Sequence, residues 1–134
     1  MEKKSSTSSI PDYRIIYEVN LSLAKQNAEG YQEWLEKFTV NVCKTVNGFT
    51  HAVCYSQPKP GNFKVIIAGL HWLSEEGGDR VYYTVHYHVD SQEHLEEYLK
   101  EQQGIVAHAE LDKWKYIVTS RRILKMISST INNS

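Results

Sequence analysis

The 134-residue sequence lacks most of the features that would assign it to a class at once. It has only two cysteines, Cys43 and Cys54, which form no CxxC motif and are too few for a disulfide framework. We therefore expect two reduced thiols, as is usual in the cytoplasm. No apolar run has the length of a bilayer span, and the N-terminal residues lack the hydrophobic core of a secretion signal, so we expect a cytoplasmic protein without a membrane partner.

A strong charge of either sign is also missing. The 15 basic and 16 acidic residues are interspersed and give a net charge of −1, which argues against nucleic acid as a partner. The sequence contains no GxGxxG, P-loop, nucleophile elbow or HExxH motif, so dinucleotide chemistry, nucleotide hydrolysis and triad hydrolysis are not indicated. We expect no cofactor and no bound metal. The length fits one domain over residues 12–127, between a disordered tail at 1–11 and a frayed tail at 128–134.

The most informative stretch is Arg80–Val89, RVYYTVHYHV, because its alternation is strict. Successive side chains of a strand point to opposite faces, so one face is apolar and the other polar. The apolar face is expected to lie under helices, and the polar face to meet water, a ligand or another subunit. The apolar set is Val81, Tyr83, Val85, Tyr87 and Val89, and the polar set is Tyr82, Thr84, His86 and His88.

The other segments fit around this strand as an α+β, ferredoxin-like βαββαβ fold, an antiparallel sheet with two helices on one face. The second helix is expected to start at a capping box of Asp90 and Glu93 and to be kinked or divided at Gly104. The segments 49–56 and 63–73 are either one interrupted strand or two strands. The expected elements are a strand from Tyr13, a helix over 31–46, these extended segments, the strand at 80–89, the second helix, and a strand at 116–126.

The sheet face without helices would expose Ile16, Tyr82 and Ile123, which is unfavourable in water. A second copy of the chain is the simplest cover, so we expect a homodimer that packs sheet to sheet.

Several short motifs together resemble a small family of unknown function within the dimeric α/β-barrel superfamily. The similarity covers about residues 13–127, and it implies homodimers with facing sheets. Relatives in the superfamily include cofactor-free monooxygenases, haem-degrading enzymes and ligand-binding domains. The motifs are YEV in the first strand, Glu33-Trp34-Leu35, Gly48-Phe49, a Gly-Gly turn before YxVxYxV, SxxxLxxYL from Ser91 to Leu99, and RRxL from Arg121 to Leu124.

His86 and His88 are the candidate catalytic bases. Two histidines at i and i+2 on a strand share a face and could also reach one metal if a third ligand came from a neighbouring strand, although residues lining a dimer interface would show the same pattern. Arg121 or Arg122 could stabilise an oxyanion, or could instead pair with Glu18. For ligand binding the candidates are Tyr17, Tyr82, Thr84 and Trp72.

Three functions follow from these residues. The first is a small-molecule-binding or structural module. The second is a cofactor-independent monooxygenase or isomerase for a small aromatic or enolic substrate. The third is a protein-interaction adaptor that uses the segment 57–73. The tryptophans of the two helices, Trp34 and Trp114, are expected to pack in the core.

Overall fold

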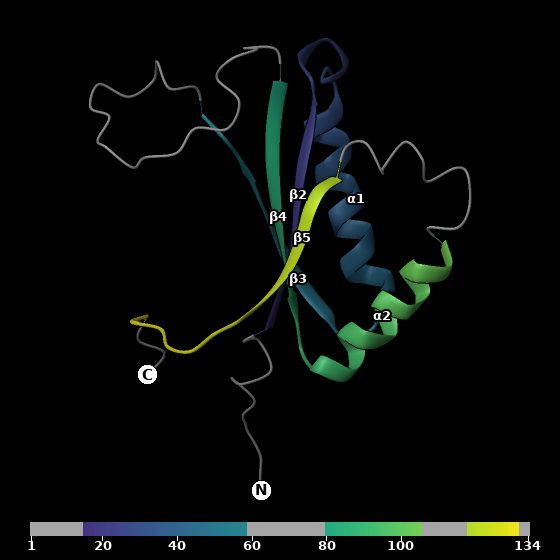
Figure 1. The fold of residues 1–134 in the computed structure, drawn as a ribbon, viewed down its shortest axis with the longest axis vertical. Coiled ribbons are helices and arrows are strands. Elements are labelled where there is room, and N and C mark those ends of the chain that lie inside the picture. Colours follow the sequence, from purple (N-terminus) through teal and green to yellow (C-terminus); the bar gives the residue numbers. More distant parts are fainter. Residues whose placement is uncertain (1–14, 59–79, 106–117, 132–134) are drawn as a thin grey trace, which may run out of the picture.

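A computed structural model describes residues 15–58, 80–105 and 118–131 of the chain. The predicted α+β fold is confirmed: four antiparallel strands lie in the order β3-β4-β2-β5, the arrangement of a ferredoxin-like fold. Both helices lie on the same side of the sheet (Figure 1). The elements are β2 (Ile15–Ala24), the short 3-10 helix η2 (Lys25–Asn27), α1 (Tyr31–Thr45), β3 (Phe49–Ser56), β4 (Arg80–Val89), α2 (Gln92–Ile105) and β5 (Val118–Lys125).

The core lies between the sheet and the helices, and β4 forms its centre. The two predicted faces of this strand are confirmed, since its odd-numbered side chains are buried from Tyr83 onward and Val89 is fully buried. Leu35 of α1 and Leu95 of α2 pack against the same cluster. We call this the covered face of the sheet, and the opposite side the open face.

Helix α1 buries the stripe Leu35, Thr39 and Val42. It begins after Gly30, whose backbone is left-handed, and the N–H of Val46 donates to the carbonyl of Val42 at its end. Trp34 departs from the expectation, because its side chain is 37% exposed. It lies at the border of the stripe and stacks on Phe38, with ring centroids 5.0 Å apart.

A tight contact joins the start of β3 to the start of α2. Gly48 has a φ of +85°, and a Cβ at this position would collide with the side chains of His94 and Asp90. The carbonyl of Gly48 accepts a hydrogen bond from the N–H of Asp90, with an N···O distance of 2.8 Å. Only glycine permits both the backbone angle and this close approach.

The predicted start of α2 was wrong by one residue. The hydroxyl of Ser91, not the carboxylate of Asp90, accepts the hydrogen bond from the N–H of His94, as an N-cap does. Asp90 instead binds the His94 ring, with Oδ1 2.7 Å from Nδ1. The helix also continues through Gly104 to Ile105, so it does not divide at the glycine itself, and the residues that would follow a kink lie outside the described part of the chain.

The predicted exposure of Ile123 on the open face was also wrong. In the register of β5, Ile123 pairs with Tyr17 and Leu124 pairs with Ile16, so Leu124 occupies the open face. Ile123 points to the covered side of this edge strand and remains 54% exposed there. The expected strand at 63–73, the turn at 74–79 and Trp114 lie outside the described residues.

Candidate functional site

The open face carries mainly polar side chains, arranged in rows across the four strands. The rows follow from the strand register, because directly paired residues point to the same side. One row is His51, His88, Ile16 and Leu124; the next is Val53, His86, Glu18 and Arg122; the third is Tyr55, Thr84, Asn20 and Ser120.

Glu18 is the central residue of this face. Its carboxylate lies between two partners from neighbouring strands, with Oε1 2.8 Å from Nε2 of His86 and Oε2 2.5 Å from Nε of Arg122. Although neither α1 nor α2 covers it, Glu18 is only 6% exposed. The hydrogen bond from Arg122 lowers the pKa of Glu18 from 4.5 to about 2, with smaller contributions from Asn20 and His86 and an opposing one from burial. Glu18 is therefore ionised at neutral pH.

Asn20 links this ion pair to the third row. Its amide nitrogen donates to Oε2 of Glu18 at 3.1 Å and to the hydroxyl of Ser120 at 3.0 Å. Its amide oxygen accepts from the hydroxyl of Thr84 at 2.7 Å. We call Glu18, His86, Arg122, Asn20 and Thr84 the polar network. Its members are joined to one another by these hydrogen bonds and ion pairs.

His86 and His88 share a face as predicted, but their rings have different partners. His86 binds Glu18, whereas His88 stacks on His51 of β3 with ring centroids 4.0 Å apart and an interplanar angle of 14°. In the described part of the chain, no three histidine, cysteine or acidic side chains gather in a way that could hold a metal ion.

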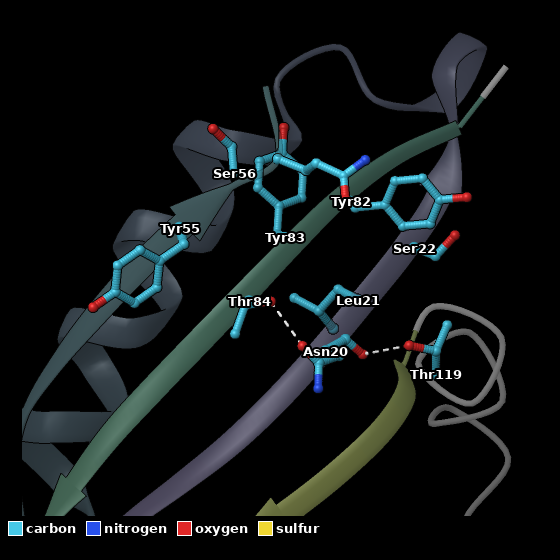
Figure 2. Close-up of a pocket in the computed structure, with 10 residues that line it drawn as sticks. Asn20, Leu21, Ser22, Tyr55, Ser56, Tyr82, Tyr83, Thr84 and Thr119 are labelled. Atoms are coloured by element: carbon cyan, nitrogen blue, oxygen red, sulfur yellow. Dashed lines mark hydrogen bonds between the residues drawn. The ribbon is translucent and has the colours of Figure 1, made fainter. Parts of the chain in front are cut away.

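Beside the polar network lies a hollow of about 390 Å³ (Figure 2). Tyr55 and Thr84 belong to the same row, and Tyr82 belongs to the next row along β4. Figure 2 shows the Tyr55 ring above β3 and the Tyr82 ring toward β2, with Thr84 and Asn20 between them. The lining is Asn20, Leu21, Ser22, Tyr55, Ser56, Gln57, Tyr82, Tyr83, Thr84 and Thr119.

The predicted site residues divide between the two faces. Tyr82, Thr84, His86 and His88 lie together on the open face. Arg121 pairs with Val19 and does not join them, and it is Arg122 that reaches the network by binding Glu18.

Tyr17 is likewise part of the covered face. It is buried and stacks on Tyr87 with ring centroids 6.1 Å apart. Burial raises the pKa of its hydroxyl, and the neighbouring Arg121 guanidinium offsets part of this shift. Trp72 and most of the segment 57–73 lie outside the described residues.

The sequence interpretation missed Asn20, Ser22 and Tyr55 as site residues. The signal was present for the first two, because they follow Glu18 at i+2 and i+4 on one strand. Tyr55 could be placed only with the register between β3 and β4, which the sequence does not contain.

Neither α1 nor α2 has the length and apolar character of a bilayer-spanning segment.

Comparison with curated proteins finds no match to this sequence. A family model does match, over residues 14–127, which is most of the chain. That family is described as a domain of unknown function, DUF4286, and the protein belongs to it.

Proposed function

We propose that the protein is a cytoplasmic small-molecule-binding module that acts as a homodimer, with its ligand in the hollow on the open face. The observation that carries this proposal is the hollow itself, bordered by a polar network whose side chains already bind one another. Ligand sites typically combine a concave surface of about 300–1,000 Å³ with a few fixed polar groups. Because Asn20 and Thr84 are held before binding, they lose little conformational freedom when a ligand arrives.

Dimerisation through the open face would convert the hollow into an enclosed cavity. With strands of eight to ten residues, four strands about 4.8 Å apart and a rise of about 3.3 Å per residue, the face covers roughly 600 Å². Two such faces bury roughly 1,200 Å², the lower limit of a stable interface. Val53 and Tyr55 are 37% and 50% exposed there and supply apolar contacts for a partner.

The dimer is the arrangement that the resemblance to the dimeric α/β-barrel superfamily implies. Cytoplasmic residence is supported by Cys43 and Cys54, which are both free thiols.

A fragment screen tests the binding proposal. Ring-containing fragments added to ¹⁵N-labelled protein are expected to shift the amide resonances of Asn20, Tyr55 and Thr84. The control region is the shallow depression on the outer side of α1 beside Lys37 and Val40, whose resonances are expected to stay unchanged.

A pair of threonine variants makes this test sharper. Thr84→Val removes the hydroxyl that orients Asn20, and we expect it to weaken fragment binding severalfold. Thr45→Val removes a hydroxyl that binds a carbonyl on exposed α1, and it should leave binding unchanged. Shifts confined to α1, or equal affinities for both variants, would show that the hollow is not the ligand site.

The contact between His86 and Glu18 favours a second candidate, a cofactor-independent isomerase or monooxygenase. An ionised Glu18 accepts a hydrogen bond from Nε2 of His86, so a neutral His86 carries its lone pair on Nδ1. A histidine oriented by a carboxylate in this way is suited to remove a proton from an enolic substrate. Arg122 provides the positive charge nearest to this pair.

The two histidines separate this candidate from a pure binding module. If His86 is the base, His86→Asn should abolish turnover of an enolic substrate, whereas His88→Asn, which removes the ring stacked on His51, should retain most of it. If both variants turn over substrate as the wild type does, His86 is not a base.

A further inference from the structure

We propose that the ligand of the hollow is a carboxylic acid that carries a planar ring, and that Arg80 binds its carboxylate. This inference rests on the proposed binding function and specifies its ligand class.

Arg80 lies at the border of the hollow. It is the first residue of β4 and belongs to the same face of the strand as Tyr82, because the two are separated by one residue. Its Nε donates a hydrogen bond to the hydroxyl of Ser22, with a distance of 2.6 Å. Ser22 is buried and lines the hollow, so this bond holds the guanidinium at its rim.

Among the described residues, two arginines belong to the open face, and they differ in what they bind. Arg122 binds the carboxylate of Glu18 through Nε and a terminal nitrogen. Arg80 forms no ion pair with any residue that the structure describes, and its described hydrogen bond, to Ser22, uses Nε. The terminal nitrogens of Arg80 are therefore suited to an acidic ligand, and a guanidinium binds a carboxylate best through two parallel hydrogen bonds.

The lining of the hollow favours an anion as well. None of its ten residues is acidic, so no carboxylate in the lining would repel the ligand. The adjacent row of the sheet contains Glu18, whose charge is already balanced by Arg122. A negative group entering beside Arg80 thus meets a neutral, hydroxyl-rich wall and one positive side chain.

The planar ring follows from the two tyrosines. Tyr55 and Tyr82 come from adjacent strands and border the hollow from different sides (Figure 2). Aromatic side chains favour planar rings by stacking or edge contacts. Ser22 and Thr84 also line the hollow, and their hydroxyls favour a ring with hydrogen-bonding substituents over a plain hydrocarbon.

Calorimetric titration of the full chain with 4-hydroxybenzoate and its neutral isostere 4-hydroxybenzamide tests the ligand class. We expect the wild type to bind the acid at least about tenfold more tightly than the amide, the usual size of one hydrogen bond between charged groups. Arg80→Gln should bring the two affinities to about the same value. Arg80→Lys keeps the positive charge but cannot form two parallel hydrogen bonds to a carboxylate, so it should retain part of the preference.

Lys44→Gln is the matched control, because it makes the same change in net charge on exposed α1. It should preserve the preference for the acid. If Arg80→Gln and Lys44→Gln lost the preference for the acid equally, the preference would come from the overall charge of the protein. That result would overturn the role of Arg80. Equal affinity of the wild type for acid and amide would overturn the ligand class while leaving a binding site in the hollow. Binding of neither compound would overturn this inference, and the fragment screen would then decide whether the hollow binds any ligand.

Discussion

Both faces of the sheet contain buried side chains, but these side chains are buried by different means. On the covered face Val85 and Val89 are buried by helices, so burial there reflects apolar packing. On the open face Glu18 is almost as buried, yet its neighbours are His86, Arg122 and other polar side chains. Stability alone does not explain a buried carboxylate with such a network, since a buried ion pair often stabilises a protein no more than apolar packing does. The comparison therefore agrees with the proposal that the open face binds the ligand.

The largest difference between the faces should appear on removal of the same two methyl groups from each. Val85→Ala is expected to lower the free energy of unfolding by about 2–3 kcal/mol, because it leaves a cavity in a packed core. Val53→Ala, on the open face, should cost less than about 1 kcal/mol. Urea unfolding of both variants measures this, and equal losses would mean that the open face is packed like a core.

Acid should weaken the open face selectively. The pKa of Glu18 is lowered from 4.5 to about 2, so its contribution to stability is present above pH 4.5 and is lost as the pH falls toward 2. Hydrogen bonds to a charged group suggest a contribution of about 1–3 kcal/mol. Urea midpoints of the wild type and of Glu18→Gln, measured between pH 6 and pH 3, should converge on acidification. A difference that does not depend on pH would refute the ionic role.

On the covered side, a change of pH should have a smaller effect on stability, and stability should fall as the pH rises. The hydrogen bond to Asp90, and then the charge of Asp90, raise the pKa of His94. Its contribution is therefore complete below the ordinary pKa of 6.5 and is lost as the pH rises through the raised value. Asp90→Asn should destabilise the protein at pH 6 and have less effect at pH 9, as measured by thermal unfolding. A larger effect at pH 9 would reverse the assignment.

The sequence predicted the covered face better than the open one for a physical reason. Apolar periodicity reports burial, so the alternation of 80–89 was sufficient to predict which side of this strand faces the core. The open face depends on which residues of different strands lie side by side. Thus Arg122 rather than Arg121 reaches Glu18, and Leu124 rather than Ile123 faces outward, because of the register of β5.

The start of α2 was also hard to predict from the sequence, because it depends on which residues lie side by side. Asp90 and Ser91 are both good N-caps, and only the position of His94 beside Gly48 shows why Asp90 has another partner.

In the proposed dimer, two copies of the protein pair through their open faces and so enclose a ligand. Sedimentation equilibrium tests this pairing most directly. The wild type should sediment as a dimer, and Val53→Lys, which places a charge on the open face, should sediment as a monomer. Val40→Lys, at an exposed valine on the outer side of α1, should remain dimeric. A monomeric wild type, or a Val53→Lys variant as dimeric as Val40→Lys, would contradict the pairing of open faces.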